Sequence, residues 1–193
     1  ELANMGSADI LEIFSIFGQA SESSLEQSRI LIDFPVAKIL KDRQAQVIPA
    51  SGSVQFKLKL SNTAHGNTTP EKFTISAYPL LRSWDEGYGM DMDSYLDVGP
   101  SNWISSSTDV LWHTTGSDYT KLTNYTSDGV GLQYSFNFEK GTENIDLNIT
   151  PIVEEWIKSY STTPGDKIAA NASLDFTSNP SENDQLKIRD AEG

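Results

Sequence analysis

Hydrophobic and polar residues alternate strictly along two stretches of the chain. In residues 54–60 every second side chain is apolar, and Lys57 and Lys59 lie between the apolar positions. Successive side chains of a β-strand point to opposite faces of a sheet, so this pattern predicts a half-buried strand with both lysines in water. Residues 132–138 repeat the alternation, with Leu132 and three aromatic residues on one face.

Shorter apolar runs bounded by turn-forming residues predict further strands. Residues 29–34 form an apolar run that stops at Pro35, which lacks the amide that a strand ladder needs. We expect residues 73–78 to be the hairpin partner of residues 54–60. The other predicted elements are strands at 10–16, 144–148, 168–176 and 185–189, a polar loop at 21–27 and a helical turn at 36–40.

One short helix is predicted near residues 151–158. Thr150 is a residue type that caps helices. Pro151 suits the first helical position, because an amide at that position has no hydrogen-bond acceptor within the helix and proline has no amide proton to leave unpaired. The apolar face of this helix comprises Ile152, Val153, Trp156 and Ile157. Short strands, frequent turns and a single short helix predict an antiparallel all-β sandwich.

The length of the chain fits one domain, residues 1–193. Hydrophobic residues make up 37% of these 193 residues, which is enough for one lean core. The sequence opens abruptly at Glu1, and no apolar closing strand is evident before Gly193. We therefore expect the chain to be a fragment of a longer polypeptide.

Charge and cysteine content narrow the functional classes. The net charge of −13 repels nucleic-acid phosphate and anionic lipid, so neither nucleic acid nor membrane is an expected partner. No apolar run approaches the roughly 20 residues of a membrane helix. The absence of cysteine excludes disulfides, thiolate zinc sites and cysteine nucleophiles. The charge is consistent with simple solubility, with cation binding or with docking to a basic partner.

Several short patterns occur in a fixed order along nearly the whole chain. They are Asn4-Met5-Gly6, Arg29 to Phe34, Trp84-Asp85-Glu86-Gly87, Asn102-Trp103, Trp112, and Asp146 to Trp156. In this order and spacing the chain resembles the DNRLRE-type jelly rolls, whose patterns include R-x-L-I-x-F, W-x-E-G and D-V-T-x-x-V-x-x-W. The chain departs from the last pattern, where Asn148 or Thr150 must stand in for the family threonine.

The resemblance implies an antiparallel β-jelly-roll sandwich with one short helix. Its structural motif residues would be Trp84, Gly87, Asn102, Trp103, Trp112, Asp146 and Trp156. Domains of this family occur in secreted bacterial surface and carbohydrate-binding proteins and as structural domains of tailed-phage virions. The Gly- and Asp-rich sequence after Trp84 resembles the phage versions.

We therefore expect a non-enzymatic structural domain of a tailed-phage virion, at the capsid surface or in the tail or its fibres. Its partners would be other virion proteins or copies of itself. The alternative is a carbohydrate-binding or adhesion module of a secreted bacterial protein, located outside the cell or on its surface. The two hypotheses are compatible, because a fibre protein can also bind a host glycan.

A group of carboxylates in one glycine-rich loop is a candidate calcium site, and no other cofactor is indicated. The group comprises Asp85, Glu86, Asp91, Asp93 and Asp97. Hard cations such as Ca²⁺ take several carboxylate and carbonyl oxygens from a flexible segment. The spacing is not that of an EF-hand, and a solvated acidic loop is the alternative interpretation.

Aromatic residues of the same region are candidates for stacking on sugar rings. Tyr88, Tyr95 and Tyr119 form the predicted sugar platform, while the family resemblance implies burial of Trp84, Trp103 and Trp156. Large aromatic side chains are more often packed than exposed, so a local core is the alternative.

Nothing in the sequence marks a catalytic centre. The two histidines, His65 and His113, do not form a ligand-spaced pair, and no pair of carboxylates stands out among the many acidic residues. We expect no enzymatic activity.

Overall fold

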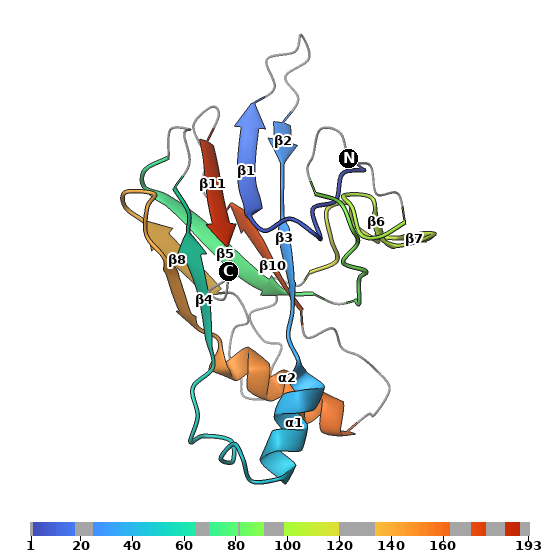
Figure 1. Ribbon diagram of the computed structural model, residues 1–193, viewed down its shortest axis with the longest axis vertical. Helices are drawn as coiled ribbons and strands as arrows, with labels where there is room; N and C mark the ends of the chain where they lie inside the picture. The colour runs from blue at the N-terminus through green and yellow to red at the C-terminus, as the bar shows by residue number, and fades with distance from the viewer. Residues whose placement is uncertain are drawn as a thin grey trace.

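The structure is a computed structural model that describes most of the chain. The described residues are 2–17, 25–64, 70–80, 82–90, 99–119, 134–162, 171–176 and 184–189. They contain two helices, α1 (Val36–Gln44) and α2 (Thr150–Thr162) (Figure 1). The strands are β1 (Leu11–Phe17), β2 (Leu25–Gln27), β3 (Ile30–Asp33), β4 (Lys57–Asn62), β5 (Phe73–Pro79), β6 (Ser105–Ser107), β7 (Val110–Leu111), β8 (Tyr134–Phe138), β9 (Ile145–Asn148), β10 (Asn171–Phe176) and β11 (Asp184–Arg189).

The strands of the described residues form antiparallel sheets, which confirms the all-β prediction. One sheet has the order β2-β1-β11-β4-β9, a second has the order β3-β10-β5-β8, and a small one pairs β6 with β7. The pairs of the two larger sheets are nested along the chain: β5 with β8 is innermost, followed by β4 with β9, β3 with β10, and β1 with β11. The β6–β7 hairpin belongs to the connection between β5 and β8.

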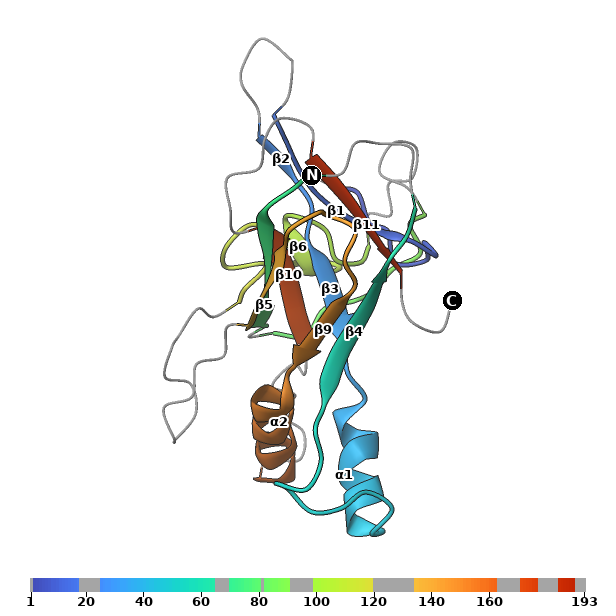
Figure 2. The same ribbon diagram turned by 90° about the vertical axis from the view of Figure 1, so that its left-hand side faces the viewer.

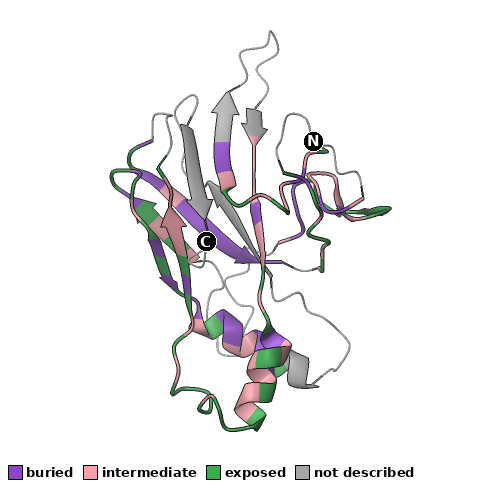
Figure 3. Cartoon of the chain, in the orientation of Figure 1, coloured by how far each residue is buried: buried purple, intermediate pink, exposed green. Residues whose placement is uncertain are grey.

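A single cluster of buried side chains takes members from both larger sheets and from α2. The five-stranded sheet contributes Ile13, Leu58, Ile145 and Leu147, the four-stranded sheet contributes Ile30, Phe73, Ile75, Ala77 and Phe138, and α2 contributes Ile152, Val153, Trp156 and Ile157. Figure 3 shows β5 buried along most of its length. Burial of apolar surface in this cluster is the main force that holds the two sheets and α2 together.

Both helices lie at the same end of the sheets (Figures 1 and 2). An ion pair joins them: Arg43 of α1 donates from Nη1 to Oε2 of Glu154 at 2.6 Å and from Nη2 to Oε1 of the same carboxylate in α2. The hydrogen bond from Arg43 holds the pKa of Glu154 below its usual value. Among the described residues no helix is long and apolar enough to cross a bilayer.

The first turn of α2 is held by Phe56, which precedes β4, and by Tyr134 of β8. Helix α2 begins at Thr150 itself, so the prediction that Thr150 caps it is wrong. The Thr150 hydroxyl instead accepts a hydrogen bond from the Phe56 amide at 2.8 Å and so ties the helix start to the approach to β4. The Ile152 amide donates to the hydroxyl of Tyr134 in β8 at 3.2 Å. Burial raises the pKa of this phenol.

Three sequence-based predictions of elements need correction. Strand β5 is not the hairpin partner of β4, because it pairs with β8 and β10, while β4 pairs with β9 and β11. Alternation of apolar residues shows which face of a strand is buried, but it carries no information about the neighbouring strand. Residues 25–27 of the predicted polar loop form β2, and α1 runs for nine residues instead of a single turn.

Candidate functional site

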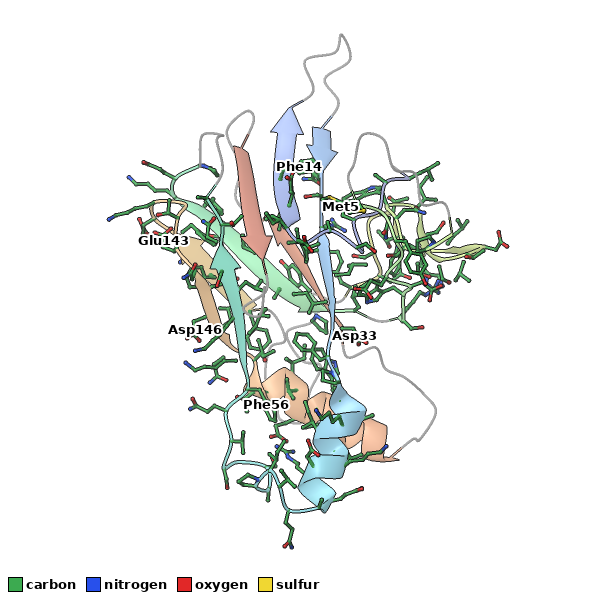
Figure 4. All side chains as sticks on the ribbon, viewed as in Figure 1. Met5, Phe14, Asp33, Phe56, Glu143 and Asp146 are labelled. Carbon is green, nitrogen blue, oxygen red and sulfur yellow. The ribbon has the colours of Figure 1, made fainter. Side chains whose placement is uncertain are left out.

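The short sequence patterns before α2 meet beside the four-stranded sheet. We call this part the loop module and define it as residues 2–10, 82–90 and 99–119. Figure 1 shows the module beside the edge strands β2 and β3 of the two larger sheets, and Figure 4 places Met5 within it. Its N-terminal segment and its long loop are more than 70 residues apart in the sequence, as the separation of 82 between Asn4 and Glu86 shows.

The buried side chain of Asn4 joins the N-terminal segment to the long loop. Its Nδ2 donates to the carbonyl oxygen of Glu86 at 2.8 Å and to that of Ser101 at 2.7 Å. Its Oδ1 accepts a hydrogen bond from the Gly6 amide at 2.8 Å. One amide side chain therefore satisfies three backbone groups, and a buried backbone group without a partner costs roughly 1–3 kcal/mol.

Glycines allow the close approach of these segments. Gly87 has a φ of 85°, and a Cβ there would collide with Pro100 and with Oδ1 of Asn4. A Cβ on Gly89 would collide with the backbone carbonyl of Asn4. The W-D-E-G pattern thus ends in a glycine because the backbone both turns and packs at that point.

Asn102 and Trp112 organise the β6–β7 hairpin. Oδ1 of Asn102 accepts hydrogen bonds from the amides of Ile104 at 2.8 Å and Ser105 at 3.0 Å, which forms a local turn. The carbonyl of Asn102 accepts a hydrogen bond from Nε1 of Trp112 at 2.8 Å. Trp112 is buried, so its indole N–H has the partner that a buried indole requires.

Arg29 attaches the module to the sheets. Its guanidinium lies over the ring of Trp103 at 4.9 Å and over the ring of Tyr119 at 5.0 Å. Nη1 also donates to the carbonyl of Gly116 at 2.6 Å. The Tyr119 ring in turn packs 4.9 Å from the ring of Tyr78 in β5. A cation held between two aromatic faces is stabilised by both of them.

Asp118 is a buried carboxylate that holds the turn after Trp112. It accepts hydrogen bonds from the amides of His113 at 3.0 Å and Thr114 at 2.8 Å, and Nδ1 of His113 lies 2.8 Å away. Nε of Arg82 lies 3.4 Å from the same carboxylate. Burial alone would raise the pKa of Asp118, but the hydrogen bonds from the two amides and from the His113 side chain outweigh it and lower this pKa. Asp118 is therefore a charged structural anchor at neutral pH.

The structure separates the remaining motif residues from the loop module. Asp146 is an exposed residue of β9 whose Oδ1 lies 3.2 Å from Nζ of Lys57. Trp156 is buried in the core, where its ring stacks 5.4 Å from that of Phe34. Trp84 and Trp103, for which burial is predicted, are half-buried.

The predicted calcium ligands fall only partly on described residues. Asp85 and Glu86 are exposed in the loop module, whereas Asp91, Asp93 and Asp97 lie outside the described residues. Among the part of the chain that the structure describes, no group of three or more His, Asp or Glu side chains is placed to hold a metal. Calcium binding by the whole set stays a prediction.

The predicted sugar platform also falls only partly on described residues, and its described tyrosines differ in exposure. Tyr88 is 83% exposed, whereas Tyr119 is half-buried between Arg29 and Tyr78. Tyr95 lies outside the described residues. Of the three tyrosines, Tyr88 offers the most ring surface to a ligand.

The anchoring roles of Asn4, Arg82 and Asp118 were not predicted. Asn4 and Arg29 belong to quoted sequence patterns, but a pattern does not name the atoms that its residues bind. The available signal for Asp118 was the run of turn-forming residue types from Thr114 to Asp118, in which the structure shows positive φ at Gly116 and Ser117. Arg82 reaches Asp118 across 36 residues, which no local pattern indicates.

Comparisons with known proteins identify no family for this chain. No protein-family model matches the chain, and no curated protein and no solved structure matches it either. The function proposed below therefore rests on the residues and the geometry of this chain.

Substitution of Gly116 tests the packing around Arg29. Gly116 has a φ of 87°, and a Cβ there would lie 2.8 Å from both Nη1 of Arg29 and Cζ2 of Trp103. Gly52 has a φ of 88° and nothing within 4 Å, so it is a matched control. We expect Gly52→Ala to lower the free energy of unfolding by about 1–2 kcal/mol and Gly116→Ala by roughly 1–3 kcal/mol more in denaturant titrations. Equal effects would show that the Arg29 contacts do not constrain this site.

The pH dependence of stability tests the role of Asp118. Because the pKa of Asp118 is lower in the folded protein than in the unfolded chain, its stabilisation is present above the unfolded value and is lost as the pH falls through the folded value. We expect the unfolding free energy of Asp118→Asn to fall less steeply than that of wild type as the pH drops below about 5. The difference in slope should correspond to the uptake of less than one proton on unfolding. The control is Asp109→Asn, which removes an exposed carboxylate. Identical pH profiles for wild type and Asp118→Asn would contradict the assignment.

Proposed function

We propose that this chain is a jelly-roll domain of the DNRLRE type that serves as a non-enzymatic structural domain of a tailed-phage virion, at the capsid surface or in the tail or its fibres. The nested pairing from β5 with β8 outward to β1 with β11 supports the jelly roll, because a rolled antiparallel ribbon pairs its strands in this order. The core cluster supports two facing sheets, since it takes side chains from both.

One observation carries the proposal: patterns from four distant parts of the chain meet in the loop module and at its attachment. Asn4 bonds to the W-D-E-G loop, and Arg29 packs on the tryptophan of the N-W pattern. Trp112 bonds to the asparagine of that pattern. This convergence supports the family resemblance, because unrelated short matches would be scattered over the fold.

The bonds made by these residues favour a structural role over a chemical one. The side-chain amides of Asn4 and Asn102 bind backbone groups, and the ionised Asp118 binds two backbone amides. Groups used in this way stabilise a local shape. A structural domain of a particle uses such a shape to present loops and sheet edges to its neighbours.

A glycan-binding module is the second candidate, and the exposure of Tyr88 favours it. An exposed tyrosine beside the exposed carboxylates of Asp85 and Glu86 offers a ring face and hydrogen-bond acceptors to a sugar. A glycan-array screen of the isolated chain would support this candidate if binding is lost in Tyr88→Ala and kept in Val47→Ala, which alters an exposed residue outside the module.

The virion proposal predicts that the native protein is purified as part of a particle. Mass spectrometry of phage-like particles would identify the chain, and electron microscopy would place symmetric copies of a two-sheet domain with two helices at one end. Recovery of the protein only as a free or cell-surface polypeptide would contradict the proposal.

A further inference from the structure

Exposed apolar side chains gather in the loop module. Among the described residues seven large hydrophobic side chains are exposed, and six of them belong to the module. The six are Leu2, Ile10, Tyr88, Met90, Val110 and Leu111, and the seventh is Val47. Figure 3 shows the exposed tip of the β6–β7 hairpin, which holds Val110 and Leu111. Single exposed apolar residues are ordinary, but this concentration in one part of the molecule is typical of an interaction surface.

The module is also acidic. The module contains five Asp and Glu residues and one Arg or Lys residue, Arg82; the acidic residues are Asp9, Asp85, Glu86, Asp109 and Asp118. Arg82 is engaged by Asp118 and by the carbonyl of Leu111, to which it donates at 2.6 Å. Asp85, Glu86 and Asp109 are exposed. A partner for this surface must therefore combine positive charge with apolar contact area.

One sheet face of the same chain carries exposed positive charge. Lys57 and Lys59 are exposed on β4 at 43% and 63%, and both approach the single carboxylate of Asp146, at 3.2 and 3.7 Å.

A sheet surface that carries lysines can contact apolar side chains as well as acidic ones. The methylene stems of Lys57 and Lys59 can cover apolar side chains while their ammonium groups meet carboxylates. An ammonium can also lie over an exposed tyrosine ring. We call the face of β4 that carries Lys57 and Lys59 the basic face.

The module and the basic face cannot satisfy each other within one copy. Figure 4 shows Met5 of the module and Asp146, which lies beside Lys57 and Lys59, on opposite sides of the molecule with the sheets between them. Contact between the two surfaces therefore requires a second molecule.

We propose that the loop module of one copy docks on the basic face of a second copy of this chain. This inference rests on the proposed assembly function and names its partner. Asp85 and Glu86 meet Lys57 and Lys59, and Tyr88 packs along the lysine stems. The two surfaces differ, so the contact is heterologous and builds a ring or an open filament instead of a closed two-fold dimer.

Sedimentation of the isolated chain tests the contact. Wild type is expected to form species larger than a monomer with rising concentration, and to dissociate when salt is raised from about 50 mM to about 500 mM. The module variant Tyr88→Ser/Leu111→Ser and the face variant Lys57→Glu/Lys59→Glu should each weaken association by roughly tenfold or more. Circular dichroism would show that both variants are folded.

Matched controls change similar residues elsewhere. Val47→Ser removes the exposed apolar side chain outside the module, and Lys38→Glu/Lys41→Glu reverses two exposed charges on α1. Both controls should associate as wild type does. Loss of association in either control to the same degree would overturn the proposed surfaces, and so would a monomeric wild type at all concentrations.

Mixing the variants distinguishes a heterologous contact from other kinds. The module variant retains an intact basic face, and the face variant retains an intact module, so an equimolar mixture should form dimers that do not grow further. Charge reversal of both surfaces in one chain, Asp85→Lys/Glu86→Lys/Lys57→Glu/Lys59→Glu, leaves no native pair and should restore association across the reversed pair. Failure of both the mixture and the fully reversed chain to associate would overturn the inference.

Failure of this contact is separable from failure of the proposed function. Particles that still incorporate the face and module variants would reject the interface and leave the virion assignment intact. Salt-sensitive filaments of a protein that is absent from particles would support the interface and reject the virion assignment.

Discussion

The guanidinium of Arg29, the residue before β3, joins the loop module to the sheets, beside the backbone bridge that pairs Leu80 with Tyr119. The alternation that buries Ile30 at the start of β3 turns Arg29 to the opposite face, where it lies between the rings of Trp103 and Tyr119. A planar, delocalised cation can stack on both rings and still donate to the Gly116 carbonyl, which a lysine ammonium cannot do in the same geometry. Asn4 then closes the module from the other side by bridging two of its loops. The module is thus fixed to the sheets by polar and aromatic contacts outside the main core.

The fold could be predicted from sequence as far as local pattern determines it. Strict alternation placed Leu58 in the core with Lys57 and Lys59 in water, and the apolar run before Pro35 is β3. The partners of the strands were less accessible, because the pairing of β4 with β9 joins residues some 90 positions apart, such as Lys57 and Asn148. Such contacts are determined by the packing of the whole core, to which a short window of sequence gives no access.

In the loop module too, the sequence indicated the local turns but not the contacts between distant segments. The order of the W-D-E-G and N-W patterns indicated that these segments belong together, and their glycine and asparagine types fit the turns that they form. The bond from Asn4 to the Glu86 carbonyl and the contact of Arg82 with Asp118 depend on three-dimensional folding of separate segments. Exposure of Tyr88 and partial burial of Tyr119 likewise follow from tertiary packing, since both residues occur in similar polar, glycine-containing surroundings.

Hydrogen exchange measured by mass spectrometry on the Arg29→Met variant tests most directly whether this side chain attaches the module. The account predicts that peptides from residues 82–90 and 99–119 lose protection together, while peptides from β4, β9 and the helices keep theirs. Arg29→Lys should give nearly the same pattern, because lysine keeps the charge but loses the planar stack. Unchanged protection of the module in Arg29→Met, or a uniform loss over the whole chain, would contradict the account.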